Sequence, residues 1–190
     1  MTRKYELKRR AERQSETRRR IVDATVGLHT TVGPARTTIS AIAVRAGVQR
    51  HTVYAHFPDE RTLFEACSTH WRERYPLPDS GSWNGIADPA RRLRAALQDV
   101  YEWYETVEDD LAVFSRDAEV HELTAELGDR RKRAIGSLRA ELADGWPRRK
   151  AVQAAIGHAL EFETWRSLAR RQGLTRKQAV DAMLSFVASV

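Results

Sequence analysis

The chain contains a single cysteine, Cys67, which excludes an internal disulfide and leaves no partner for a zinc knuckle or a CxxC redox motif. Phe64, Ala66 and Trp71 surround this cysteine with apolar side chains at helical spacing. We therefore expect Cys67 to be a buried structural thiol, and a reactive thiol is the alternative.

Long apolar runs are also missing. No apolar stretch of about 18 residues occurs, and the basic N-terminus lacks the apolar segment of a secretory signal. The sequence therefore predicts a cytoplasmic protein with no membrane partner. No strand pattern, internal repeat or low-complexity segment competes with the helical periodicity, so we expect an all-α fold.

Motifs of catalysis and metal binding are absent from the sequence. It contains no GxSxG, no HExxH and no glycine-rich phosphate loop, and its six histidines show no metal-ligand spacing with Asp or Cys. We expect no catalytic residues, no metal and no cofactor. An enzyme stays as an alternative of a different class.

What the chain does have is an excess of positive charge in its first part. Residues 1–78 carry 15 Lys+Arg against 8 Asp+Glu, a net charge of +7, whereas residues 79–190 carry 17 against 18, a net charge of −1. A basic part joined to a neutral one is typical of a nucleic-acid-binding domain with a second domain, although a solvated face or a membrane-surface patch has the same charge. Residues 1–20 carry nine Lys+Arg against three Glu, a net charge of +6 that accounts for nearly all of this excess. The basic N-terminal arm, residues 1–16, either extends the first helix or forms a solvated tail.

Residues 37–57 have the pattern of two short helices with a tight turn between them. Thr37 or Thr38 can cap the first helix, and Gly47 follows its last periodic residue, where a left-handed backbone commonly ends a helix. The apolar positions of the first helix follow the spacing i, i+3, i+4 and i+7: Ile39, Ile42, Ala43 and Ala46. This pattern predicts a helix-turn-helix.

The second helix of this pair has an outward face without a single carboxylate. Such a face suits contacts with phosphates and base edges, although an ordinary helical hairpin with a solvated polar face is the alternative. Its hydrogen-bonding residues are Gln49, Arg50, His51, Thr52, Tyr54 and His56. We interpret it as a recognition helix.

Residues 18–66 closely resemble the N-terminal DNA-binding domain of the TetR family of transcriptional regulators. Two residues depart from the family pattern: Gln49 stands where a serine cap is frequent, and Glu60 stands where a phosphate-binding lysine is frequent, with Arg61 beside it as a candidate replacement. The resemblance rests on Ile21, Ala24, Gly33, Thr38, Ile42, Ala43, Ala46, Gly47, Val48, Tyr54, Phe57 and Leu63.

The resemblance implies a function and an arrangement of domains. It implies a homodimeric regulator, most simply a repressor, that binds a palindromic operator in double-stranded DNA and is released by a small organic effector. The basic arm at 1–16 would precede a helix-turn-helix DNA-binding domain at 17–58 and a helical effector-binding and dimerisation domain at 59–190. An architectural DNA-binding protein without an effector is the alternative.

The same resemblance assigns roles in DNA binding to individual residues. Arg50, His51 and Thr52 would reach base edges, although Arg50 could instead contact a phosphate. Gln49 and Tyr54 would contact bases or backbone. The backbone contacts and further candidates are Thr38, His56, Ser40 and Arg61.

Beyond the helix-turn-helix the sequence predicts further helices, with a loop at 76–89. We expect helices at about 17–30, 59–75, 89–107, 111–115, 119–143 and 148–171, and one that starts with a capping box at Thr175 and Gln178. In the helix at 119–143 the expected inward residues are Val120, Leu123, Leu127, Ala134, Ile135, Leu138 and Leu142.

Two functions are predicted for this second part. The helix at 148–171 is apolar on more than one face, so we expect it and the last helix to pair with their copies in a dimer. In the resembled family the helices surround a small-molecule pocket, although aromatic residues at helical spacing more often pack in a core. The candidate effector-binding residues are Trp71, Trp103, Tyr104, Phe114, His121, His158, Phe162 and Trp165.

Overall fold

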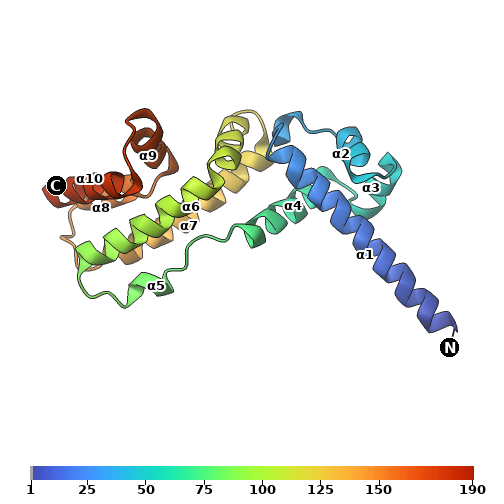
Figure 1. The fold of residues 1–190 in the computed structure, drawn as a ribbon, viewed down its shortest axis with the longest axis horizontal. Coiled ribbons are helices and arrows are strands. Elements are labelled where there is room, and N and C mark those ends of the chain that lie inside the picture. Colours follow the sequence, from blue (N-terminus) through green and yellow to red (C-terminus); the bar gives the residue numbers. More distant parts are fainter. Residues whose placement is uncertain (1) are drawn as a thin grey trace. The chain divides into compact units, whose positions relative to one another are not determined.

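The computed structural model describes residues 2–190, with side chains from Tyr5 onward, and this described part is helical without any strand (Figure 1). The all-α prediction is therefore confirmed. The helices are α1 (Thr2–His29), α2 (Ile39–Ala46), α3 (Arg50–His56), α4 (Glu60–Arg74), α5 (Gly81–Asn84), α6 (Pro89–Asp117), α7 (Glu122–Leu142), α8 (Lys150–Ala159), α9 (Phe162–Arg166) and α10 (Arg176–Ser189), with a 3-10 turn at Pro34–Arg36 and a π-helical turn at Ser167–Arg171.

The chain forms two compact units, and α6 and α7 each contribute residues to both. The first unit, which we call the head unit, comprises residues 1–75 and 109–128. The second unit comprises residues 76–108 and 129–190. In the part of the chain that the structure describes, no helix is long and apolar enough to cross a membrane.

The head unit packs α1, α2, α3 and α4 around one apolar core. The predicted apolar periodicity of the helix-turn-helix is confirmed, because Ile42, Ala43 and Ala46 are buried on α2 and Val53 is buried on α3. The remaining buried core residues are Ile21, Val22, Ala24, Phe57, Leu63 and Cys67.

The helix ends of the head unit follow the predicted capping. The Thr38 side chain accepts a hydrogen bond from the Ala41 amide at 3.2 Å, and Gly47 adopts a left-handed φ of 64°. Asp59 accepts from the Thr62 amide at 2.7 Å and starts α4. Local sequence signals therefore fix both boundaries of α2 and the start of α4.

The first helix is longer than the predicted 17–30. Helix α1 begins at Thr2, so the described backbone of the basic arm extends this helix, one of the two alternatives the sequence left open. Met1 and the side chains of residues 2–4 lie outside the described part, and the side chains of residues 5–16 are exposed. The arm therefore presents its charge to solvent as a helix.

The predicted single helix at 148–171 is wrong. Helix α8 ends at Ala159, Glu161 is extended with ψ of 140°, and α9 and a π-helical turn follow. The hydroxyls of Tyr101 and Tyr104 donate hydrogen bonds to the carbonyls of Ala159 and Leu160 at 2.8 and 2.7 Å. These bonds satisfy carbonyls that a continuing helix would otherwise pair, so the chain can break there.

The dimer prediction assumes that the helix at 148–171 has an apolar face that its own chain leaves uncovered, and α8 has no such face. Its apolar residues Val152, Ala155, Ile156 and Ala159 are at most 3% exposed within a single chain, so α8 has no surplus apolar face. The last helix, α10, keeps Phe186 at 42% exposure. Its predicted capping box at Thr175 and Gln178 is confirmed.

Two smaller predictions are corrected, and a third is confirmed. The predicted break after residue 107 is present, because Val107 is non-helical and divides α6 into two helical segments, the second of which runs to Asp117 and is longer than the predicted 111–115. The predicted loop at 76–89 contains the short helix α5, whose Trp83 is buried. Val120 and Ala134 point outward rather than inward, and Val120, which precedes the start of α7, is 78% exposed.

Candidate DNA-binding surface and effector pocket

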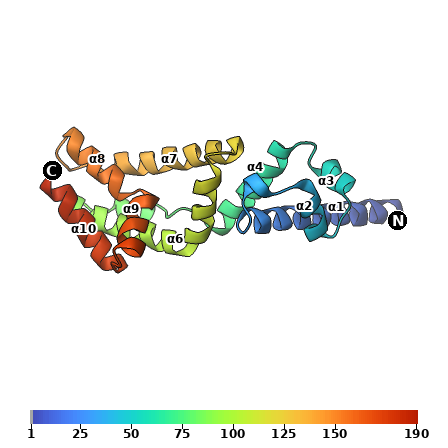
Figure 2. The ribbon, with the colours of Figure 1, turned by 90° about the horizontal axis from the view of Figure 1, so that it is seen from above.

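Helix α3 has an exposed polar face and a buried residue that packs against the core. Val53 is fully buried, whereas Arg50, His51 and Tyr54 are exposed, and 46% of the Tyr54 surface is accessible to solvent. Thr52 and His56 are half-buried. Figure 1 and Figure 2 show α3 beside α2, and the exposed residues of α3 offer hydrogen-bonding groups to solvent.

The two departures from the family pattern have visible consequences. Gln49 occupies the N-cap position of α3 but makes no capping hydrogen bond, as its side chain predicts. Glu60 is exposed, and its Oε1 lies 3.1 Å from Nε2 of His121. Arg61, the candidate replacement for a phosphate-binding lysine, donates two bonds to the Glu126 carboxylate at 2.8 and 2.9 Å, which raise the pKa of its guanidinium.

The remaining predicted backbone contacts lie at the start of α2. Thr38 and Ser40 are both exposed, and the Thr38 oxygen already caps the helix. A cap oxygen that accepts from a backbone amide leaves its hydroxyl hydrogen free to donate to a phosphate oxygen. Thr38 can therefore serve both roles.

The connection between α1 and α2 is held by a buried carboxylate. The Asp117 side chain is 3% exposed and accepts from the Ala35 amide at 2.9 Å and from Arg116 at 2.7 Å. Gly33 adopts φ of 103°, and a Cβ on it would lie 2.2 Å from Oδ2 of Asp117. Only glycine meets both the backbone conformation and the close approach.

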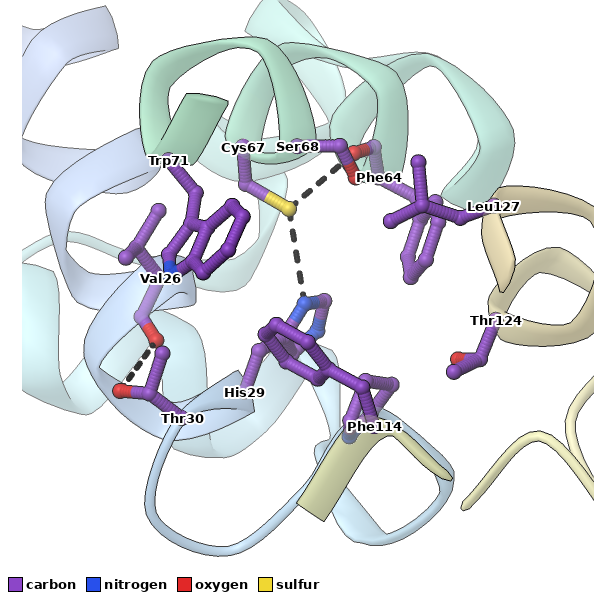
Figure 3. A pocket seen from close by; sticks show the side chains of 11 residues that line it. Val26, His29, Thr30, Phe64, Cys67, Ser68, Trp71, Phe114, Thr124 and Leu127 are labelled. Carbon is purple, nitrogen blue, oxygen red and sulfur yellow. Dashed lines mark hydrogen bonds between the residues drawn. The ribbon is translucent and has the colours of Figure 1, made fainter. Parts of the chain in front are cut away.

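A small cavity lies inside the head unit, between α1, α4, α6 and α7 (Figure 3). Its volume is about 20 Å³, which suits one water-sized molecule and is too small for an organic effector. Its lining is mostly apolar and aromatic: Val26, His29, Thr30, Pro34, Phe64, Cys67, Ser68, Trp71, Phe114, Thr124 and Leu127.

Cys67 and His29 meet at this cavity, as Figure 3 shows. The Cys67 thiol donates to the Phe64 carbonyl at 3.1 Å, and its sulfur lies 3.4 Å from Nδ1 of His29. Burial raises the pKa of Cys67 to about 12, so the prediction of a buried structural thiol is confirmed. Burial also lowers the pKa of His29 to about 4, with the charge of His121 as a second cause.

The structure divides the predicted effector-binding residues between the two units. Trp71 and Phe114 line the cavity, with ring centroids 5.6 Å apart, and Nε1 of Trp71 donates to Asp110 at 2.6 Å. His121 lies beside this group, with its ring 5.7 Å from that of Phe64, but its nitrogens contact Glu60 and Thr124.

The other predicted residues belong to the second unit. The Tyr104 ring packs against Trp103, Phe162 and Trp165 in tilted and edge-on geometries, with centroid distances of 5.5, 5.3 and 5.7 Å. All four are at most 9% exposed, so in this conformation they form a packed core. His158 is exposed and lies 3.2 Å from the Thr164 hydroxyl.

Sequence reasoning missed His29, Phe64 and Cys67 as cavity residues. His29 and Cys67 are 38 positions apart, and each fits an ordinary apolar helix pattern. No local signal distinguishes residues that line a cavity from residues that fill a core. The contact of Arg61 with Glu126, 65 positions away, is equally invisible in the sequence.

Comparison with known proteins agrees with this geometry. Residues 21–67 match the family model described as bacterial regulatory proteins, tetR family. No curated protein sequence matches the chain. The matched residues run from α1 to α4 and contain the whole helix-turn-helix.

Solved structures share the fold along nearly the whole chain. A TetR-like transcriptional regulator from Rhodococcus sp. RHA1 is similar with a TM-score of 0.63 and 20% identity, over 90% of this chain and 93% of that one. AibR, solved with isovaleryl coenzyme A and operator DNA, has a TM-score of 0.61 and 19% identity over 89% and 96%. NalD of Pseudomonas aeruginosa, the secondary repressor of the MexAB-OprM multidrug efflux pump, has a TM-score of 0.60 and 18% identity over 93% and 96%.

The fold and the family model agree with each other. The described residues have the architecture of TetR-like regulators, with the helix-turn-helix in the head unit. Residues 21–67 match the model of the tetR family of bacterial regulatory proteins, and the fold of the chain is similar to that of TetR-like regulators along nearly its whole length.

Proposed function

We propose that the protein is a sequence-specific transcriptional repressor that binds a palindromic operator as a homodimer and is released by a small organic effector. Such a protein would act in the cytoplasm, where the bacterial chromosome lies. The observation that carries this proposal is the exposed face of α3, which combines Arg50, His51 and Tyr54 with no carboxylate.

The chemistry of α3 supports base reading. An arginine can donate two parallel hydrogen bonds to O6 and N7 of guanine, which contributes about 1–3 kcal/mol of discrimination. His51 and Thr52 add further hydrogen-bonding groups on the same helix, with Gln49 at its start. Thr38, Ser40 and His56 would position the helix on phosphates. Arg61 would join them only after it leaves Glu126.

Relatives support the repressor and effector parts of the proposal. NalD is described as a repressor, and AibR was solved with both a coenzyme A thioester and operator DNA. In this chain we propose that the effector binds among the predicted aromatic residues, with Trp71 and Phe114 at the cavity of the head unit. The cavity of about 20 Å³ must then enlarge when the effector binds.

Helix α4 would connect such a site to the DNA-binding surface. Its first turn follows the recognition helix through Phe57 and Asp59, and Trp71 near its other end lines the cavity. An effector that displaces Trp71 would shift α4 and thereby α3. Linkage then requires operator DNA to weaken effector binding by the same factor.

Titration against DNA tests the proposal. The full chain should bind DNA from upstream of its own gene at least about 10³-fold more tightly than random DNA at the same salt concentration. Equal affinity for both would support the alternative, an architectural DNA-binding protein. No affinity for either would contradict DNA binding altogether and reopen the enzyme hypothesis.

A further inference from the structure

A second hollow in the head unit lies against α1, α2, α3 and α4, and we call it the head pocket. Its volume is about 260 Å³. A cavity of about 150 Å³ already holds benzene, so the head pocket has room for a substituted aromatic ring. It shares His29, Pro34 and Phe64 with the small cavity, and its other lining residues are Thr37, Ile39, Ile42, Tyr54, Glu60 and Leu63.

The hydrogen bonds of Cys67 favour one tautomer of His29. The thiol donates to the Phe64 carbonyl at 3.1 Å, and in this arrangement the sulfur accepts from Nδ1 of His29 at 3.4 Å. Nδ1 therefore carries the imidazole hydrogen, and Nε2 has a free lone pair. Within residues 2–190, no donor reaches Nε2 of His29, although the side chain is 9% exposed.

His29 lines the head pocket, and no hydrogen bond from the described side chains occupies its second ring nitrogen, so this nitrogen is available to a molecule in the pocket. The lowered pKa of His29, about 4, keeps the ring neutral at neutral pH, which preserves the lone pair. The Thr37 hydroxyl is already committed to the Gly33 carbonyl at 2.7 Å, so it cannot supply the missing hydrogen. The donor to Nε2 is therefore a molecule in the pocket, which is either water or a ligand that carries a hydroxyl group.

The remaining walls of the head pocket are largely apolar and therefore favour a ligand with an apolar ring. Ile39, Ile42, Leu63 and Phe64 form its walls, and Ile42 and Leu63 are each 3% exposed. Burial of aromatic surface against such walls provides most of the affinity of a small ligand, and one directed hydrogen bond fixes its orientation.

We propose that the head pocket binds a small neutral aromatic molecule of the size of phenol, whose O–H donates to Nε2 of His29 and whose ring packs against Ile42, Leu63 and Phe64. This site differs from the effector site proposed above, because it lies under the DNA-binding helices. Tyr54 of α3 forms part of its wall, so occupancy would act on a DNA-contact residue directly.

Phenol and anisole provide the test, since the methyl ether keeps the ring and the oxygen but removes the donor. Titration of the full chain by NMR should show phenol binding roughly 2- to 13-fold more tightly than anisole, the ratio that one hydrogen bond provides. The amide shifts should concentrate at Ile39, Ile42 and Leu63. Equal affinities, or shifts at other residues, would overturn the proposal.

Variants separate the donor contact from the pocket. His29→Phe should bind phenol and anisole equally, whereas Ile39→Trp should fill the pocket and abolish binding of both. Val44→Trp is the control, because Val44 lies on the same helix but is 82% exposed and outside the pocket. If His29→Phe does not fold, the Ile39 and Val44 variants still show whether phenol binds in the head pocket. Phenol binding that persists in Ile39→Trp would refute the site. These titrations need no DNA, so their outcome is independent of whether the operator titration succeeds.

Discussion

Gly33 and Gly136 offer a paired substitution whose two members should change stability in opposite directions. Gly33 has φ of 103° and ψ of 151°, a region that only glycine populates readily, and a side chain there costs about 1–3 kcal/mol in strain. The new Cβ would also lie 2.2 Å from Oδ2 of Asp117 and displace it from the Ala35 amide. Loss of that charged hydrogen bond costs about 1.5–3 kcal/mol, so Gly33→Ala should destabilise the protein by about 2.5–6 kcal/mol.

Gly136 is the matched control. It lies inside α7 with nothing within 4 Å of an added Cβ, so Gly136→Ala should stabilise the helix by about 1 kcal/mol. Urea unfolding followed by circular dichroism measures both variants. A Gly33→Ala protein within about 0.5 kcal/mol of the wild type, the range of ordinary surface substitutions, would refute the role assigned to the Asp117 contact.

Three further predictions concern DNA binding and pH. Arg50→Ala should lower operator affinity by about 1–3 kcal/mol and relax preference at one base pair per half-site, whereas uniform weakening would make Arg50 a backbone contact. Deletion of residues 1–16 should flatten the dependence of DNA affinity on salt and leave sequence preference intact, and an unchanged slope in filter binding would exclude the arm from the complex. The pKa of His29 is lowered by burial from 6.5 to about 4, so neutral His29 contributes stability above pH 6.5 that is lost as the pH falls toward 4. The free energy of unfolding, measured in urea, should therefore fall by up to about 3 kcal/mol more for the wild type than for His29→Phe over that pH range. An equal fall in both proteins would contradict the assignment.

The parts of the fold that the sequence predicts correctly depend on local signals. The spacing of Ile42, Ala43 and Ala46, the cap at Thr38 and the left-handed Gly47 lie within ten consecutive residues, and together they define α2 and the turn after it. The same holds for the capping box at the start of α10. Each of these signals acts over one or two helical turns, so it can be read without the rest of the chain.

The parts that could not be predicted depend on contacts between distant residues. The break after Ala159 relies on hydroxyls of Tyr101 and Tyr104, 58 and 56 positions away from the carbonyls they bind. The turn at Gly33 depends on Asp117, which binds the Ala35 amide from 82 positions away. Arg61 resembles a free phosphate ligand in the sequence and is instead paired with Glu126. Tertiary packing decided each of these against the local pattern.

Selection of binding sites from a pool of random double-stranded DNA tests the central claim most directly. The claim is that the exposed face of α3 reads a specific sequence in a two-fold symmetric complex. The full chain should enrich an inverted repeat whose half-site centres lie about 10 base pairs apart or at a multiple of that spacing. Enrichment of no sequence, or of a single half-site without symmetry, would contradict the account.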